Sequence, residues 1–423
     1  MRCKRIDPRW LAPVVLIAFW TGDISSAPAA AQLGYTLIRS VQAQTGGFYH
    51  GDASADLTLI AVGPYLTGDP SRTETRGYIT FFNAEGEALA RTGVGGTVWS
   101  VAMTPDGTRT VAGSDDEKLY VFNRTTLVAS GAPVAGDATL RGVAVTDDGR
   151  YAGVGGTWFT LHDLSAADPI RPIYTDTTPS QVRAVAFSAS GRYVAYGGWN
   201  NVEANRQGAA PTMYLAVYDV QLRQRVFTHG ITYPAGAIAE LRHLSISSDG
   251  NKIVAGNWAY HFLYYVRSDP SSTTWELKHD VELTQRVYWT AMDPTGSVAV
   301  VGEQSGLVRL YALGDSELTL LWEKRGKMDG ISGGPRTVGI SPDGRHVMAT
   351  TRGGCGEGDG GRFTVWSRDG ELVFSAATAD VDLTCTGTSP AAESWFGAIA
   401  ESGTHLAFAG WGGSAYFYRL GSP

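Results

Sequence analysis

Tryptophan, tyrosine and arginine side chains recur at two fixed positions of a motif that the chain repeats eight times. Such side chains supply much of the binding energy at interfaces, because they offer a large apolar area or several hydrogen-bond donors. Aromatic faces can stack on sugar rings or flat ligands, and guanidinium groups can grip carboxylates. The candidate binding residues are Trp99, Arg141, Arg183, Trp199, Arg242, Trp258, Tyr288, Arg336, Trp395 and Trp411.

The motif that carries these residues consists of two apolar runs joined by a short turn. Residues 182–198, "VRAVAFSASGRYVAYGG", are one copy. The other copies begin at residues 48, 98, 140, 241, 287, 335 and 394. Seven of the eight copies have a glycine in the turn, and the first has Leu57 there. This pattern predicts eight β-hairpins with tight turns.

A third β-like run follows each hairpin, such as "KLYVFN" (118–123), and a shorter fourth run follows several of them. Each unit is therefore a meander of roughly 45–50 residues, a period typical of propeller blades. Such a unit cannot bury both of its faces alone, but a closed ring of units can. The sequence predicts an all-β fold, an eight-bladed β-propeller of four-stranded antiparallel blades.

The two ends of the repeated region complement each other. The last unit has no fourth run, and a spare β-like run, "YTLIRSV" (35–41), precedes the first unit. We expect this N-terminal strand to complete the last blade and close the ring, because closure removes a loose sheet edge.

Residues 98–123, "VWSVAMTPDGTRTVAGSDDEKLYVFN", resemble a WD40 repeat, and the other units are similar. Two features of WD40 repeats are missing: no Gly-His pair precedes the first strand, and pairs such as Tyr218-Asp219 replace Trp-Asp. The chain thus resembles a divergent secreted WD40-like propeller, and it is also similar to quinoprotein-dehydrogenase-like propellers. In such propellers the candidate residues would crowd one rim of the central channel.

Two interpretations of these rim residues remain open. In the first, they only pack: a tryptophan fills the gap between two blades, and an arginine pairs with an acidic neighbour. In the second, they form a recognition surface for a ligand. The repeat register is compatible with both interpretations, since it places the residues on one face without specifying their contacts.

The N-terminal segment has the pattern of a secretory signal peptide. A basic start, "MRCKR", is followed by an apolar run (11–20) and by Ala29-Ala30-Ala31, a small-residue cleavage pattern. We expect residues 1–31 to be this signal peptide, although a retained membrane anchor is an alternative. Residues 32–423 would then form a single propeller domain in the periplasm or outside the cell, with no membrane insertion after cleavage. In an oxidising compartment Cys355 and Cys385 would form a disulfide.

The charge balance argues against nucleic acid as a partner. The chain has 34 Lys and Arg residues against 41 Asp and Glu residues, a formal net charge of −7. An acidic protein of this kind is repelled by phosphate backbones.

No catalytic motif is evident in the sequence. A nucleophile elbow, a P-loop, HExxH and CxxC are all missing, so we predict no catalytic residues, no metal ligands and no cofactor. His50 and His243 occupy equivalent positions in blades one and five, and an eight-bladed channel should be too wide for both to bind one metal. An Asp/His pair in the channel of a hydrolase or lyase remains possible.

The favoured function is a non-catalytic binding scaffold that recognises a protein, peptide or glycan through the aromatic and arginine-rich rim, as a monomer or as a subunit of a complex. The alternative is a quinone- or metal-dependent oxidoreductase, or a subunit of one, because an arginine-rich rim could attract the carboxylates of a quinone cofactor.

Overall fold

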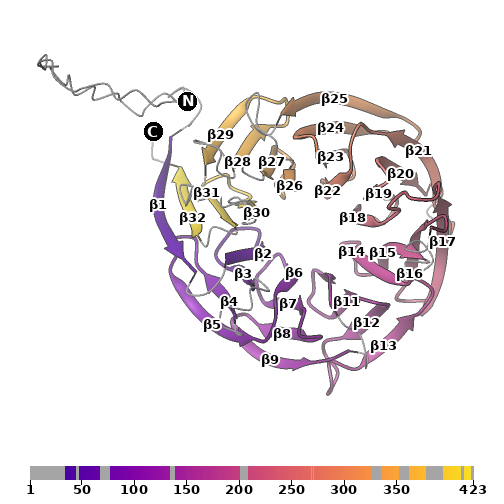
Figure 1. The fold of residues 1–423 in the computed structure, drawn as a ribbon. Coiled ribbons are helices and arrows are strands. Elements are labelled where there is room, and N and C mark those ends of the chain that lie inside the picture. The colour runs from indigo at the N-terminus through magenta and orange to yellow at the C-terminus, as the bar shows by residue number, and fades with distance from the viewer. Residues whose placement is uncertain are drawn as a thin grey trace, which may run out of the picture.

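The computed structural model describes residues 34–43, 47–66, 77–133, 139–200, 208–267, 269, 271–325, 335–351, 362–377, 394–410 and 414–420. Every secondary-structure element assigned within these ranges is a β-strand, and the strands form eight four-stranded sheets. Figure 1 shows the sheets arranged as the blades of a ring, with the first strand of each blade nearest the centre. The predicted all-β, eight-bladed propeller is confirmed.

The first four blades contain these strands. Blade 1 has β2 (Gly47–Ala53), β3 (Ile60–Tyr65), β4 (Gly77–Phe82) and β5 (Ala88–Val94). Blade 2 has β6 (Val98–Met103), β7 (Arg109–Ser114), β8 (Leu119–Asn123) and β9 (Thr126–Gly131). Blade 3 has β10 (Gly142–Val145), β11 (Tyr151–Gly155), β12 (Phe159–Asp163) and β13 (Pro172–Asp176). Blade 4 has β14 (Gln181–Phe187), β15 (Tyr193–Asn200), β16 (Thr212–Asp219) and β17 (Gln224–Thr232).

The other four blades follow the same plan. Blade 5 has β18 (Leu241–Ile246), β19 (Lys252–Asn257), β20 (His261–Val266) and β21 (Glu276–Glu282). Blade 6 has β22 (Val287–Met292), β23 (Val298–Glu303), β24 (Leu307–Leu313) and β25 (Leu318–Arg325). Blade 7 has β26 (Pro335–Ile340), β27 (His346–Thr351), β28 (Arg362–Ser367) and β29 (Leu372–Ala377). Blade 8 has β30 (Ser394–Ile399), β31 (His405–Gly410), β32 (Ser414–Leu420) and the N-terminal β1 (Tyr35–Gln42).

The ring is closed by the N-terminal strand, as predicted. Strand β1 pairs antiparallel with β32, from Tyr35 opposite Leu420 to Gln42 opposite Ser414, so the two ends of the described chain lie side by side (Figure 1). The hydroxyl of Tyr35 also donates to the carbonyl oxygen of Gly403 at 2.5 Å. The last blade therefore depends on both ends of the chain.

The turn of each hairpin is stabilised locally. In blade 2 the Thr104 hydroxyl donates to Oδ1 of Asp106 at 2.6 Å, and the backbone N–H of Thr108 donates to the same oxygen at 2.9 Å. Gly107 takes a φ of +69°, a conformation that glycine adopts without a steric penalty. Leu57 adopts a φ of 58° at the same place in blade 1, which explains how a hairpin forms there without glycine.

The inner strands contain a bulge at the position of the rim residues. The pairing between first and second strands skips one residue in blades 2, 4, 5, 6, 7 and 8. A β-bulge leaves the extra residue outside the ladder and re-aims its side chain. The skipped residues are Trp99, Arg183, Arg242, Tyr288, Arg336 and Trp395.

The hydrophobic core lies between neighbouring blades rather than inside one. One cluster joins Leu215 and Val217 of blade 4 to Leu244 and Leu263 of blade 5, and similar clusters occur between the other pairs. Close packing also explains the glycine pair that precedes Trp199. A Cβ atom on Gly198 would collide with the carbonyl oxygen of Gln181 on the neighbouring strand.

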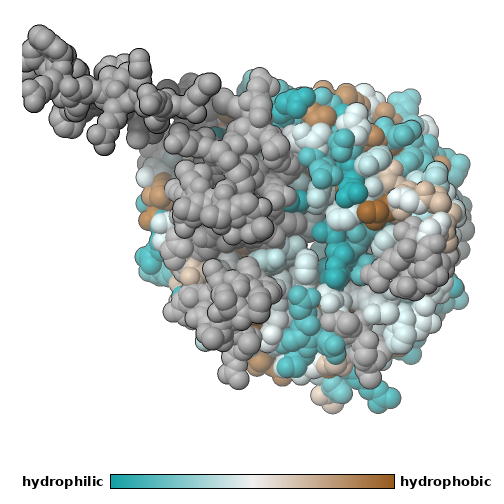
Figure 2. Space-filling model, in the orientation of Figure 1, coloured by the Kyte–Doolittle hydropathy of each residue, from teal (hydrophilic) through white to brown (hydrophobic). Residues whose placement is uncertain are grey.

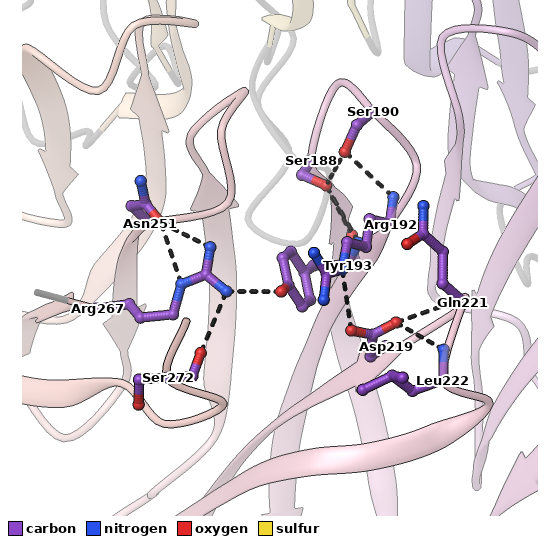
Figure 3. A network of polar contacts seen from close by, with 10 residues as sticks. All are labelled: Ser188, Ser190, Arg192, Tyr193, Asp219, Gln221, Leu222, Asn251, Arg267 and Ser272. Atoms are coloured by element: carbon purple, nitrogen blue, oxygen red, sulfur yellow. Dashed lines mark hydrogen bonds and ion pairs between the residues drawn. The ribbon is translucent and has the colours of Figure 1, made fainter. Parts of the chain in front are cut away.

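A polar network on the side of the glycine turns links blades 4 and 5 (Figure 3). Arg267, which is 5% exposed, donates from Nη1 to the Tyr193 hydroxyl at 2.6 Å and from Nε to Oδ1 of Asn251 at 3.0 Å. Its guanidinium carbon also lies 4.6 Å from the centroid of the Tyr193 ring. All of these groups are partnered within the protein, so the network is structural.

Candidate binding surface at the channel mouth

The first group of rim residues joins blades 1, 2 and 3 through ring contacts. The Tyr49 ring stacks on Tyr65, with centroids 5.4 Å apart, and meets the Trp99 ring edge-on at 5.2 Å. The guanidinium carbon of Arg141 lies 5.0 Å from the centroid of Trp99. Cation–π contacts of this kind hold a guanidinium in place without neutralising its charge.

A second group joins blades 5, 6 and 7 in the same way. The guanidinium carbons of Arg242 and Arg286 lie 4.9 Å and 5.0 Å from the centroid of Trp258. The Trp258 ring meets Tyr288 edge-on at 5.8 Å, and Arg336 lies 4.7 Å from the Tyr288 centroid. Arginines and aromatic rings therefore alternate around this part of the mouth.

A buried carboxylate connects the arginines of blades 4 and 5. Glu240 is 2% exposed, and its Oε1 contacts Nε of Arg183. Its Oε2 lies 3.8 Å from Nη1 of Arg242. Glu240 was not among the sequence candidates, although it directly precedes a motif copy as a charged residue in an apolar context.

We name Arg141, Arg183, Arg242, Arg286 and Arg336 the arginine belt. The arginine belt concentrates positive charge in a poorly solvated place. Burial lowers the pKa of Arg183, and the positive charges of Arg242 and Arg141 lower it further. Burial likewise lowers the pKa of Arg141 and of Arg242. A single buried carboxylate, Glu240, pairs with both Arg183 and Arg242.

The remaining predicted residues lie elsewhere or beyond the described part. Trp199 is half-buried, and its Nε1 donates to Oε1 of Gln181 within the same blade at 3.0 Å. Among the described residues, no ring contact between Trp199 and the arginine belt is seen. Strand β30 includes the backbone of Trp395, but its side chain is outside the described atoms. The predicted site residue Trp411, the predicted disulfide and the predicted signal peptide fall outside the described residues, at Trp411, Cys355, Cys385 and 1–31.

The inner strands enclose a cavity of about 380 Å³ below the arginine belt. The strands of blades 1 to 5 line it, and Arg141, Arg183 and Arg242 are part of its wall. A second cavity of about 220 Å³ is lined by blades 1, 7 and 8. Figure 2 shows hydrophilic residues beside the centre of the ring on the face that it views.

Trp289 borders both cavities and contacts two histidines. Its indole stacks on His243, with centroids 3.9 Å apart, and lies 5.4 Å from the ring of His50. The channel is therefore filled where the sequence suggested open space between these histidines. Trp289 was missed as a channel residue. The sequence feature that could have identified it is a bulky ring at the third position of the motif, where blade 3 has only Gly142.

The titratable groups of the channel are held by neighbouring backbone. His50 Nδ1 accepts from the Val101 N–H at 3.2 Å, and Asp52 Oδ2 accepts from the Met103 N–H at 2.8 Å. Burial lowers the pKa of His50 to about 4 and that of His243 to about 3. Burial raises the pKa of Asp52 to about 6. An Asp and a His thus do line the channel, but both serve as acceptors between blades 1 and 2.

Neither a metal-binding cluster nor a membrane-spanning helix is found among the described residues. No group of three or more His, Cys, Asp and Glu side chains there is arranged to hold a metal ion. The same ranges contain no helix with the length and apolar character needed to cross a bilayer.

Comparisons with known proteins agree with the fold. The family model described as "WD domain, G-beta repeat" matches residues 90–123, which include the hairpin of blade 2. No curated protein gives a significant sequence match. Among solved structures, the chain is similar to Sqt1 of Chaetomium thermophilum bound to the N-terminus of the ribosomal protein L10, with a TM-score of 0.68 and 14% identity. The match covers 90% of this chain and 99% of that one.

This match contradicts the predicted location. The N-terminal pattern predicts a periplasmic or secreted protein, whereas the matched propeller was solved with part of a ribosomal protein, a component of the cell interior. The expectation is therefore wrong by this comparison, which at 14% identity shows the fold and assigns no other compartment. The chain is thus an eight-bladed β-propeller closed by its N-terminal strand, in which residues 90–123 match the model of a WD40 repeat.

Proposed function

We propose that this chain is a non-catalytic scaffold that binds a protein or peptide at the channel mouth. The observation that carries the proposal is the arginine belt, in which cation–π contacts at 4.7–5.0 Å hold Arg141, Arg242, Arg286 and Arg336 in position. Guanidinium groups that are held in place lose little conformational entropy when they bind, so they are well suited to recognition.

The ring contacts favour a protein or peptide over a glycan. Stacking on a sugar needs an accessible aromatic face. Guanidinium groups already lie over the rings of Trp99, Trp258 and Tyr288. A sugar stacked on these covered faces would have to displace an arginine, whereas a carboxylate of a peptide could bind the guanidinium groups where they lie.

The two interpretations of the rim residues are compatible in this arrangement. The aromatic rings pack between blades, and in doing so they position the arginines. Among the described residues, the buried Glu240 pairs with two members of the belt, Arg183 and Arg242. The structural neighbour supports the proposal in one respect: Sqt1, a propeller of similar fold, was solved with the N-terminus of a ribosomal protein bound to it.

A capture experiment tests this function. Immobilised wild-type protein, the double variant R141Q/R242Q and the control R345Q would be exposed to lysate of the native organism, and bound proteins would be quantified by mass spectrometry. Arg345 follows a glycine turn and its side chain is 80% exposed, so it lies far from the belt. We expect a partner retained by wild type and R345Q and lost by the double variant.

Thermal melting of the three proteins serves as the folding control. Equal capture by a folded R141Q/R242Q variant would show that the channel mouth is not the binding surface. A visible absorption spectrum of the purified protein addresses the alternative function, since a quinone or copper chromophore would favour the oxidoreductase.

A further inference from the structure

Several buried hydrogen-bond donors at the channel mouth have no acceptor among the described residues. Nε1 of Trp99, Nε of Arg141 and Nε1 of Trp258 are buried atoms for which the described residues supply no hydrogen-bond acceptor. In folded proteins roughly 90% or more of buried polar groups are paired. Three unmet donors around one mouth indicate that an acceptor is supplied from outside the described structure.

The arginine side chains of the cavity wall meet few carboxylates among the described residues. Arg141, Arg183 and Arg242 line the cavity, and the carboxylates that the described residues place near them are Glu240, Asp115 and Asp52. Asp52 lies deeper in the channel and already accepts from the backbone N–H groups of Ala53 and Met103. Of the described carboxylates, Glu240 and Asp115 are thus left to meet the three guanidinium groups of the cavity wall, and one further anionic group would balance the third.

The cavity wall combines charge with apolar surface. Arg141, Arg183 and Arg242 line it together with Val143 and Leu244, and its volume is about 380 Å³. A cavity of this size accepts a side chain or a small molecule rather than a folded domain. Its lining suits a group with an apolar stem and a planar, negatively charged end, because the guanidinium fork matches the two oxygens of a carboxylate.

We propose that this cavity is a carboxylate site that takes a glutamate-type side chain from an acidic peptide segment. The carboxylate would lie among Arg141, Arg183 and Arg242 and accept from the indole N–H of Trp99. This inference rests on the proposed function, since it specifies the chemistry of the partner segment. A free dicarboxylic acid offers the same chemistry, and the experiment separates these two sources.

Isothermal titration calorimetry at low salt provides the test. The probes are acetyl-tetraglutamate amide, the matched acetyl-tetraglutamine amide, glutarate and inorganic phosphate. We expect the glutamate peptide to bind and the glutamine peptide not to bind, with affinity falling as salt is added. Glutarate that binds as tightly as the peptide would support the site and assign it to a free acid.

Single substitutions test the residues. R141Q should weaken the glutamate peptide at least about tenfold, since hydrogen bonds to charged groups are worth about 1.5–3 kcal/mol. Trp99→Phe keeps an aromatic ring beside Arg141 but removes the N–H, and it should weaken binding several-fold without unfolding the protein. R345Q on the turn side should bind like wild type.

Three results would overturn the carboxylate site: equal binding of the two peptides, an unchanged affinity in both R141Q and Trp99→Phe, or phosphate binding tighter than glutarate. The lysate experiment separates this failure from that of the proposed function. A partner that depends on the arginine belt but does not compete with the glutamate peptide would uphold the scaffold and reject the carboxylate site.

Discussion

The indole of Trp289 stacks on the imidazole of His243, with ring centroids 3.9 Å apart and an interplanar angle of 26°. The same indole contacts His50 of blade 1, so one side chain from blade 6 connects three inner strands. Both cavities of the channel have His50 and Trp289 in their walls. These rings therefore separate the cavity below the arginine belt from its smaller neighbour, and they limit how far a ligand can enter.

Replacing Trp289 with alanine should merge the two cavities and destabilise the fold. Truncating a buried tryptophan costs about 3–5 kcal/mol, and the half-buried Trp289 should lie near the lower end of that range. The free energy of unfolding from urea denaturation measures the effect. Trp289→Phe keeps a ring against His243, so its free energy of unfolding should fall less than that of Trp289→Ala. Equal midpoints for wild type and Trp289→Ala would mean that the indole does not support the channel.

Acidification should weaken the fold through the channel histidines. Burial lowers the pKa of His50 to about 4 and that of His243 to about 3, whereas a histidine in the unfolded chain has a pKa near 6.5. Below pH 6.5 the unfolded chain therefore binds more protons than the folded one. Each histidine should cost about 1.4 kcal/mol per pH unit between pH 6.5 and its folded value. Burial raises the pKa of Asp52 to about 6, which gives the opposite slope below pH 6 and offsets about one histidine.

The variant His243→Phe isolates this effect, because it preserves a ring on Trp289 and removes one titrating group. The free energy of unfolding, measured from pH 7 to pH 4, should fall less steeply in the variant than in wild type. Parallel curves would show that His243 does not titrate differently in the folded and unfolded chains.

Glu240→Gln should destabilise the protein and increase its affinity for anions. Removing one partner of a buried ion pair costs about 3–5 kcal/mol, because the remaining charge stays buried and unpaired. A double-mutant cycle with Arg183→Gln measures the coupling between these side chains, which contact each other directly. A coupling below about 0.5 kcal/mol would contradict a strong pair. In calorimetry, the glutamate peptide should bind the folded Glu240→Gln variant more tightly than wild type.

Deleting residues 32–42 should unfold the ring cooperatively. The deletion removes the whole of β1 and exposes β32, whose backbone pairs with β1 along its length. Tyr35→Phe is a milder variant that removes only the hydroxyl bond to Gly403, and it should cost about 1 kcal/mol. Differential scanning calorimetry measures both. A deletion variant that keeps the wild-type melting temperature would show that closure by β1 contributes nothing.

Much of the fold could be predicted because the repeat is a local pattern. Turn residues such as Gly107 and apolar alternation specify each hairpin within about twenty residues of chain, and eight copies require a closed ring. The spare N-terminal run was recognised as the missing strand of blade 8 for the same reason. Rim positions such as Arg141 and Trp258 followed from the register, and in the structure each takes part in a cation–π contact at the channel mouth.

The sequence by itself thus determined the number of blades, the closure of the ring and the position of the rim residues, since these depend on contacts within a repeat or between its two ends. Only the tertiary structure decided what these residues meet. Trp289 reaches His50 although 239 positions (289 − 50) separate them, because the ring brings blades 1 and 6 to one axis. Glu240 meets Arg183 because the bulge in β14 releases that arginine from the strand ladder and turns it toward the next blade.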